Sequence, residues 1–480
     1  MSRIPRGLGL VALLAAAGPT PALAQRGAAP ASAAIRIPFE KYTLPNGLTV
    51  ILAQEHSTPT VAVEVLYHVG SKNEQPGRTG FAHLFEHVMF TGSGHVPYGL
   101  HDKFTEGVGG GNNGNTTNDF TQYYETIPSN YLEHALWLES DRMGWLLDAL
   151  DTAKYNAQRD IVKNERRQGV DNQPYGRADE IIKAAIYPKT NPYSWPVIGS
   201  MTDLSAASVE DVKAFFRLYY APNNAVLAIA GDFDPAQTRA WVAKYFAGVP
   251  RGTPIARPTV PPTRLAAEKR LVYEDRVQVP RLYLVWPTVG EESDDQYALD
   301  VLSDVLTRSR ISRLTKPLVY DEQSAASIFS YQDSNENAGE FDIIVTPRPG
   351  HSLTGLEADV DTILSKLRRD GPTDDEIRRS KATLQLAFLA GLESNLGKAQ
   401  RLAIGQAFHN DPNRAFAVDY QRYQAVTAAD VKRVADKYLG AGRVVLSIVP
   451  LGKRGEASKP EASVTVTQAH GSTTHPAEGK

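Results

Sequence analysis

Apolar and polar residues alternate from Phe39 onward, and this pattern predicts strands followed by buried helices. Two short apolar runs, Tyr42–Leu44 and Leu48–Leu52, flank Pro45-Asn46-Gly47, whose Asn-Gly dipeptide favours a tight hairpin turn. The alternating stretch Val61–Val69 is predicted to form a third strand. Because strands here precede a buried helix, we expect a mixed sheet with helices on one face.

The helix that follows carries the candidate chemistry. The stretch Thr79–Thr91, TGFAHLFEHVMFT, interleaves apolar and polar residues and predicts a short buried helix. Side chains four positions apart share a helix face, so His83 and His87 can present imidazole nitrogens to one point, as zinc requires of two ligands. Glu86 is close enough to take a proton from a water held by such a metal. Alternatively, the three residues satisfy one another in a core.

A glycine-rich and asparagine-rich stretch, Gly107–Thr121, leads into Gln122–Ile127, which has strong strand propensity. Glycines let the backbone approach other groups closely. A strand preceded in this way could lie at a sheet edge and accept an extended peptide as an added strand. A loose surface loop is the other interpretation.

Two helices are predicted over Tyr131–Leu150 and Ala153–Gln168, and the second carries Glu165 in its interior. An acidic residue on a charged helix is usually solvated. This one nevertheless supplies a carboxylate that a fold could return to the histidines. A catalytic zinc site has three protein ligands and one open position for water, so Glu165 is a candidate third ligand.

The second half of the chain repeats the first. Residues 209–229 match residues 428–448 without gaps at an offset of 219, since 430 − 211 = 219. The match predicts two homologous α+β halves, each closed by a helix and a strand. Five prolines in Pro250–Arg264 mark the linker between them. In the second half the helix predicted over Gln296–Leu306 has Leu299 and Ser303 where histidines would be needed, so only the first half can hold metal.

His83-x-x-Glu86-His87, followed by Glu165, resembles the pitrilysin (insulinase) family of inverted-motif zinc metallopeptidases. The Leu44–Leu48 hairpin and the spacing Gly110-x-x-Asn113-x-x-Thr116 agree with that family. The resemblance covers roughly residues 38–450. It implies two halves, each a mixed sheet covered by helices, facing each other as a clam-shell. It further implies a zinc endopeptidase that acts on peptides or unfolded segments, with the following residues: zinc ligands His83, His87 and Glu165 for one Zn²⁺ per chain, general base Glu86, and substrate-binding Asn113 and Thr116.

Two departures from the family pattern change this expectation. Where the family often has a second glutamate near the metal, this chain has Gln158, which can hydrogen-bond but brings no charge. Members that act alone also carry an arginine and a tyrosine in the second half, and Tyr320 and Ala326 stand at those places. We therefore expect a homologous partner subunit that lacks the zinc motif but supplies the Arg/Tyr pair. A homodimer, and a non-catalytic assembly or peptide-binding subunit, are the alternatives.

Composition and the N-terminus set the remaining limits. A net charge of −3 in 480 residues gives no support to binding of nucleic acid or an anionic membrane, and the absence of cysteine excludes disulfides and thiolate metal sites. Arg3 and Arg6, the apolar run Gly7–Gly18 and the cleavage pattern Ala22-Leu23-Ala24 predict a signal peptide over residues 1–24 and a periplasmic or secreted protein. No later apolar run is long enough for a membrane span.

The sequence predicts five segments after the signal peptide. A flexible leader (25–37) precedes an N-terminal zinc-binding domain (38–249), a linker (250–267), a metal-free C-terminal domain (268–451) and a disordered tail (452–480). In the C-terminal domain, Leu353–Asp370 and Asp374–Gln400 are predicted helices. His470 and His475 in the tail are interpreted as solvated residues, not metal ligands.

Overall fold

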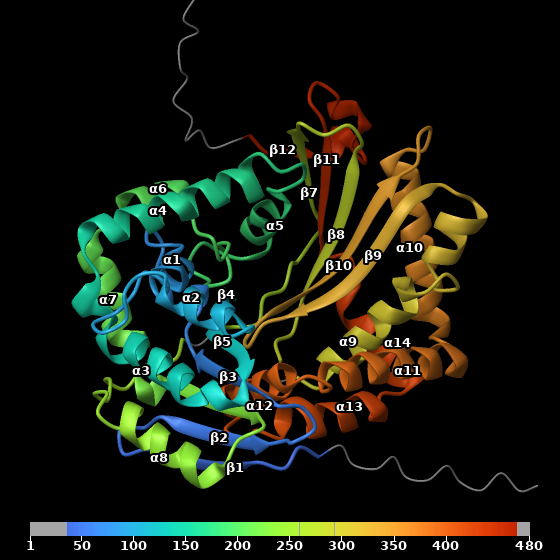
Figure 1. The fold of residues 1–480 in the computed structure, drawn as a ribbon. Coiled ribbons are helices and arrows are strands. Elements are labelled where there is room, and N and C mark those ends of the chain that lie inside the picture. Colours follow the sequence, from blue (N-terminus) through green and yellow to red (C-terminus); the bar gives the residue numbers. More distant parts are fainter. Residues whose placement is uncertain (1–35, 259, 292, 468–480) are drawn as a thin grey trace, which may run out of the picture. The chain divides into compact units, whose positions relative to one another are not determined.

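Each half of the chain is built on one six-stranded mixed sheet (Figure 1). This computed structural model describes residues 36–258, 260–291 and 293–467, so the predicted signal peptide and most of the leader lie outside the described residues. The strand orders are β1-β2-β6-β3-β5-β4 and β12-β7-β11-β8-β10-β9. Five neighbouring positions correspond between the two sheets, from β2 with β7 to β4 with β9. The predicted fold class, two α+β halves with mixed sheets, is confirmed.

The elements of the first half are β1 (Glu40–Thr43), β2 (Thr49–Gln54), β3 (Thr60–Tyr67), α1 (Phe81–Val88), α2 (Leu100–Gly107), β4 (Gly111–Thr116), β5 (Thr121–Pro128), α3 (Leu132–Ala149), α4 (Thr152–Arg166), α5 (Ala178–Ile186), α6 (Met201–Ala206), α7 (Val209–Tyr219), β6 (Ala225–Gly231) and α8 (Pro235–Phe246). Those of the second half are β7 (Lys269–Asp275), β8 (Arg281–Thr288), α9 (Asp295–Ser303), β9 (Ala325–Ser334), β10 (Gly339–Pro347), α10 (Leu353–Asp370), α11 (Asp374–Gly391), α12 (Asn395–His409), α13 (Asp419–Ala425), α14 (Ala428–Tyr438), β11 (Val444–Pro450) and β12 (Val464–Thr465).

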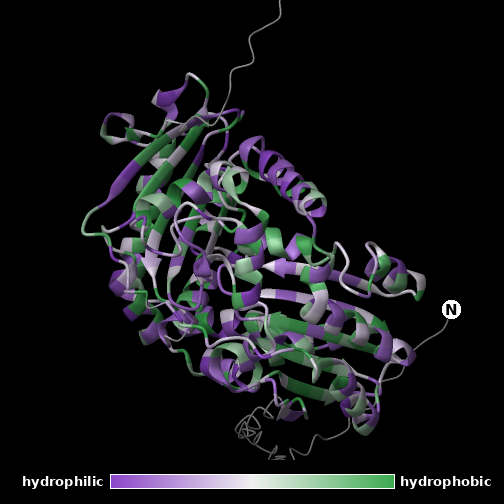
Figure 2. Ribbon diagram, turned by 90° about the vertical axis from the view of Figure 1, so that its left-hand side faces the viewer, coloured by the Kyte–Doolittle hydropathy of each residue, from purple (hydrophilic) through white to green (hydrophobic). Residues whose placement is uncertain are grey.

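The central strands are hydrophobic because both of their faces are covered. Every residue of β6 is buried, and β6 runs parallel to β2 and antiparallel to β3. Figure 2 shows long hydrophobic stretches along the strands, whereas the helices alternate between hydrophobic and hydrophilic residues. This alternation is expected of helices that pack one face on a sheet and expose the other to solvent.

The internal repeat is confirmed residue by residue. α7 and α14 have the same bounds at an offset of 219 (428 − 209 = 219), and so do β6 and β11 (444 − 225 = 219). Both helices begin with a capping box, Ser208 with Asp211 and Thr427 with Asp430. A capping box satisfies two backbone N–H groups that the first turn of a helix leaves without partners.

A helix from each half also packs on the sheet of the other half. α12 of the second half packs on β3 and β6 of the first, and Asn395 donates a hydrogen bond to the Thr60 carbonyl at 3.1 Å. In return, α5 of the first half packs on β11, where Ile182 and Ile186 share a hydrophobic cluster with Leu446. The two halves are therefore joined by exchanged helices as well as by the linker.

Two predicted elements differ from the structure. The sheet edge is β4, within the Gly/Asn stretch itself, and the predicted edge strand Gln122–Ile127 belongs to β5, one position inside. The predicted helix Asp374–Gln400 is interrupted after Gly391 and restarts at Asn395, where Ser394 caps α12. Among the described residues, no helix combines the length and apolar character needed to cross a lipid bilayer.

The prediction of disorder from residue 452 onward is wrong for residues 452–467. β12 adds to β7 as a parallel edge strand, and Ser458 is fully buried with its hydroxyl bonded to Glu357. The reason is a buried charge network. Arg270 and Arg443 donate to Glu357 at 2.6 and 2.9 Å, and the segment around Ser458 covers these groups. Residues 468–480, with His470 and His475, lie outside the described part of the chain.

We expect Glu357→Gln to lower the free energy of unfolding by about 3–5 kcal/mol, because it leaves two buried guanidinium groups short of a countercharge. Urea denaturation monitored by circular dichroism measures this loss. Asp361→Asn is the matched control: it pairs with the same Arg443, but its side chain is 40% exposed, so a loss below about 1 kcal/mol is expected. Equal losses in the two variants would contradict the network.

The stability difference between the wild type and Glu357→Gln should depend on pH. Burial raises the pKa of Glu357, but hydrogen bonds from Arg270 and Ser458 outweigh it and bring the pKa from 4.5 to about 2. The stabilisation is therefore complete above pH 4.5 and is lost as the pH falls toward 2. The stability difference between wild type and Glu357→Gln should shrink over that window.

Candidate active site

The histidine-bearing helix α1 begins where a buried glutamate satisfies its first backbone N–H groups. The carboxylate of Glu74 accepts hydrogen bonds from the backbone N–H groups of Gly80 at 2.9 Å and Ala82 at 2.8 Å. Gly80 itself has φ +88°, and a Cβ there would lie 2.8 Å from the Ile198 carbonyl oxygen. Only glycine fits this position, which fixes where α1 starts.

Opposite faces of α1 have different surroundings. One face is buried in the core, with Phe85 stacked against Phe215 and Phe216 of α7. The other face carries His83 and His87, whose rings lie edge to face with centroids 4.9 Å apart. Because the buried face cannot rotate without opening the core, the two imidazoles are held toward α4.

Glu165 is brought to the histidines by the last turn of α4. The next residue, Arg166, is 5% exposed, donates to the Gly199 carbonyl at 2.6 Å and pairs with Glu180 at 2.5 Å. These bonds fix the end of α4. The Glu165 Oε2 atom lies 3.2 Å from His87 Nε2 and 3.9 Å from His83 Nε2. The fold therefore does return this distant carboxylate to the motif helix.

One ligand atom from each of His83, His87 and Glu165 lies within 4.8 Å of the others, and among the described residues no other group of three such side chains does so. Ligand atoms of a tetrahedral zinc ion are about 3.3 Å apart, so small side-chain movements would suffice to close on a metal. His83 Nδ1 is buried without a hydrogen-bond partner in the described chain, and its Nε2 faces the site. Two nitrogens and one carboxylate oxygen are a donor set that zinc accepts.

Burial, and then the neighbouring His87, lowers the pKa of His83 from 6.5 to about 4. A neutral imidazole is the form that binds metal. Burial also raises the pKa of Glu86, as does the carboxylate of Glu165, while Thr116 and His87 oppose this shift. Glu86 is therefore poised to exchange a proton nearer neutral pH than an exposed glutamate would.

The edge strand β4 lies against α1 beside Glu86. A Cβ at Gly114 would lie 3.0 Å from the Glu86 Cγ atom and 3.2 Å from the Phe90 ring, so a side chain here would crowd Glu86. Thr116, at the end of β4, faces Glu86. Asn113 is exposed on the same strand and pairs across with Tyr124. Gly114 and Thr116 of the Gly/Asn stretch thus lie beside Glu86, and Asn113 is exposed on the same strand.

Gln158 lies on α4 and is 9% exposed, and its amide makes no hydrogen bond within the described chain. In the second half, α9 corresponds to α1. Leu299 there is fully buried, and Ser303 donates to the Ser330 carbonyl at 2.9 Å. Tyr320 is 45% exposed, and Ala326 lies at the start of β9. The second half offers no metal ligands at the corresponding places.

Sequence reasoning missed two residues that shape this site, Glu74 and Gly114. Glu74 lies between the third strand and the motif helix, and its role depends on burial, which the sequence does not display. The signal for Gly114 was present in the glycine content of the stretch, but only the structure identifies Glu86 as its neighbour.

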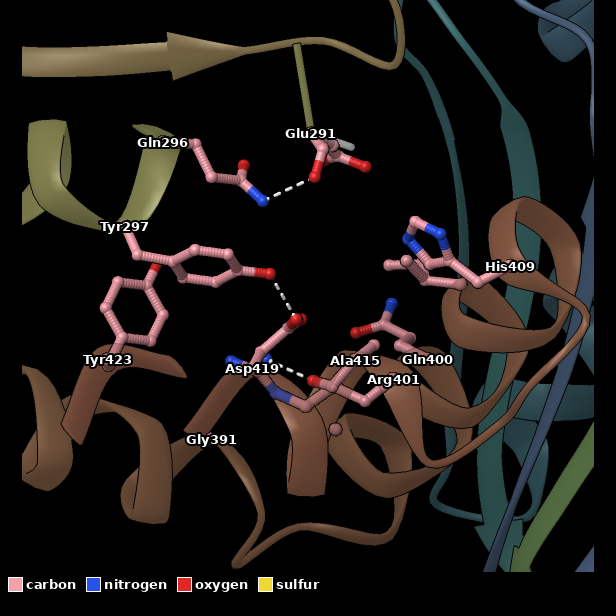
Figure 3. A pocket seen from close by; sticks show the side chains of 12 residues that line it. Glu291, Gln296, Tyr297, Gly391, Gln400, Arg401, His409, Ala415, Asp419 and Tyr423 are labelled. Carbon is pink, nitrogen blue, oxygen red and sulfur yellow. Dashed lines mark hydrogen bonds between the residues drawn. The ribbon is translucent and has the colours of Figure 1, made fainter. Parts of the chain in front are cut away.

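A separate hollow of about 440 Å³ lies in the second half (Figure 3). Its lining includes Glu291, Tyr297, Arg401 and Asp419, and none of the residues of the histidine cluster. Tyr297 donates to Asp419 at 2.6 Å. Burial and nearby carboxylates raise the pKa of Glu291 to about 8. The hollow is therefore a polar site distinct from the histidine cluster.

Comparisons with known proteins agree with this geometry. The family profile described as insulinase (peptidase family M16) matches residues 49–196, and the one described as peptidase M16 inactive domain matches residues 206–384. A relative from Helicobacter pylori named zinc protease PqqE is 30% identical over 406 residues, which cover 83% of this chain and 90% of the relative. Mitochondrial-processing peptidase subunit beta from Lentinula edodes is 24% identical, over 84% of this chain and 88% of that protein.

Solved structures share the fold. The crystal structure of a protease from Helicobacter pylori has a TM-score of 0.80 at 28% identity and covers 86% of this chain and 99% of that chain. A structure from Pseudomonas fluorescens described as a peptidase M16 inactive domain has a TM-score of 0.76 at 20% identity, over 86% of this chain and 98% of its own. This second likeness concerns the fold alone.

Proposed function

Because the chain belongs to the insulinase family of peptidases, family M16, we propose that it is the zinc-bearing subunit of an endopeptidase that cleaves peptides or unfolded segments. The observation that carries this proposal is the convergence of His83, His87 and Glu165 within 4.8 Å. Glu86, on the same helix as the two histidines, supplies the base.

His83 Nε2, His87 Nε2 and the Glu165 carboxylate would hold one zinc ion. When bound, zinc lowers the pKa of water toward about 7 and polarises a peptide carbonyl. The Glu86 carboxylate takes a proton from the attacking water as its oxygen adds to the carbonyl carbon. Glu86 then passes that proton to the amine nitrogen as the C–N bond breaks. The raised pKa of Glu86 suits both transfers.

The edge strand β4 supports binding of an extended substrate. Its outer side has no neighbouring strand in the described chain, and it borders Glu86 at Gly114. A peptide added alongside β4 would place its backbone across the cleft, with Asn113 and Thr116 as substrate contacts. Main-chain pairing is largely independent of sequence, which favours unfolded segments over folded proteins.

The second half motivates the proposal of a partner. Tyr320 and Ala326 occupy the places of the expected arginine and tyrosine, so this chain lacks the pair that would hold the substrate and polarise its carbonyl. We propose a heterodimer in which a homologous subunit without the zinc motif supplies both residues. The signal sequence would place this assembly in the periplasm or outside the cell.

A non-catalytic assembly or peptide-binding subunit is the second candidate, and the missing Arg/Tyr pair favours it. The intact ligand set and Glu86 favour the enzyme. Zinc stoichiometry combined with a peptide-cleavage assay separates the two, because a binding subunit captures peptide without cutting it.

We expect Glu86→Gln to retain zinc while losing about 10²–10⁴-fold in turnover, because the amide is isosteric but cannot accept the proton. Metal analysis and a fluorogenic peptide assay on the same preparation measure both quantities. Asp160→Asn, on α4 with a side chain 65% exposed, is the control. Wild-type turnover in Glu86→Gln would rule out this residue as the base.

We expect Glu165→Gln to weaken zinc binding by at least about 100-fold, because a neutral amide replaces the anionic ligand. Competition with a chromophoric chelator measures the dissociation constant. Asp160→Asn on the same helix, with a side chain 65% exposed, should bind zinc as the wild type does. If both variants bind zinc equally, Glu165 is not a ligand.

The partner proposal predicts little peptidase activity for the purified chain alone and a large gain on mixing with a homologous subunit that carries the Arg/Tyr pair. Size-exclusion chromatography should show co-elution of the two chains. Full activity of the isolated chain would contradict the heterodimer while leaving the zinc site intact.

A further inference from the structure

The edge hairpins of the two halves meet at their turns. Asn118, in the turn between β4 and β5, donates its amide N–H to the Asn335 side-chain oxygen at 2.7 Å. Asn335 lies in the turn between β9 and β10, where the next backbone N–H, that of Glu336, donates to the Asp119 carboxylate at 2.9 Å. Together with Lys72 we name these residues the clasp: Lys72, Asn118, Asp119, Asn335 and Glu336.

The clasp joins two hairpins, β4–β5 and β9–β10, that occupy corresponding places in the two sheets. Each turn packs on a glycine of its own half. A Cβ at Gly70 would lie 2.5 Å from the Asn118 backbone, and a Cβ at Gly290 would lie 2.6 Å from the Glu336 carbonyl oxygen. The two corresponding hairpins therefore contact each other at their turns.

A single buried ammonium group serves both acids of the clasp. Lys72, with a side chain 1% exposed, lies 2.9 Å from the Asp119 carboxylate and pairs with Glu336. His68 Nε2 is 2.7 Å from Glu336, and the Tyr193 hydroxyl donates to Asp119 at 2.7 Å. Burial raises the pKa of Glu336, but His68 and Lys72 outweigh it and bring the pKa to about 2. Because the charges are buried, removing one of them is costly.

The clasp lies at the turn of the hairpin that borders Glu86. β4 is an edge strand of sequence GNNGNT, whose two glycines make it a weak strand former. Thr116, which faces Glu86, is two residues from Asn118. The strand therefore depends on its neighbours for order, and its turn is bound directly to the second half.

We propose that Asn335 and Glu336 of the metal-free half are positioning residues that hold the β4–β5 hairpin against α1, and so order the edge strand beside Glu86. This gives the second half a role at the candidate site of the first, although it carries no metal ligand at the corresponding places. The effect on peptide cleavage rests on the proposed function, whereas the effect on strand order does not.

Hydrogen–deuterium exchange of the full-length chain tests the ordering. We expect Asn335→Ala and Glu336→Gln to speed amide exchange in residues 111–128 by about tenfold, as loss of a charged or buried hydrogen bond implies. The strand β2 should be unaffected. Asn337→Ala is the matched control, because its side chain in the same turn makes only a 3.5 Å contact with Tyr193. Wild-type exchange over residues 111–128 in both test variants would overturn the proposal.

Kinetics and metal binding supply the second test. The two variants should bind zinc as the wild type does, because they leave α1 and α4 untouched, while KM for a peptide rises about three- to tenfold and kcat changes less. In a double-mutant cycle, Asn118→Ala combined with Asn335→Ala should cost no more than either change alone. Additive effects, or an unchanged KM, would overturn the proposal. These kinetics are measured with a homologous subunit that carries the Arg/Tyr pair; if the wild type cuts no peptide even then, the proposed function fails, and hydrogen exchange still decides the clasp.

Discussion

The geometry of the candidate site depends on the packing of the buried face of α1 against the core. Phe85 and its apolar neighbours lock this short helix against α7, so the opposite face can present two imidazoles in fixed directions. Everything else at the site is arranged relative to that face. α4 brings Glu165 across it, anchored through Arg166, and the glycine at position 114 lets an edge strand approach Glu86 closely. A helix of only eight residues would be marginal by itself, so its order comes from packing.

The two halves share one architecture but have diverged in chemistry. In the first half, α1 carries the titratable side chains of His83, Glu86 and His87. In the second half, the corresponding helix α9 carries Leu299, which is buried in the core, and Ser303, which donates a hydrogen bond to the neighbouring strand β9. The second half has no metal ligands at the places that correspond to His83 and His87, yet it packs on the first half. It provides α12 as cover for the first sheet and a turn that contacts the β4–β5 hairpin. The metal-free half therefore contributes to the structure of the first through packing.

Sequence patterns predicted local features well because they depend on local periodicity. The hairpin around Asn46, the repeat at an offset of 219 and the helix Leu353–Asp370 are all present in the structure. The His83 and His87 pair could be predicted because helical spacing alone puts them on one face. Glu165 needed the family resemblance, since nothing local says which solvated-looking carboxylate will return to the motif.

What failed, or could not be predicted, depends on long-range contacts. The segment around Ser458 looked disordered because it lacks large apolar residues, yet its order comes from Glu357 and two arginines distant in sequence. The clasp was equally invisible, since Asn118 and Asn335 look like ordinary turn residues.

Anomalous diffraction at the zinc absorption edge tests the central claim most directly. The account predicts one zinc peak per chain, bounded by His83, His87 and Glu165, and a peak elsewhere or no peak in zinc-loaded crystals would contradict it.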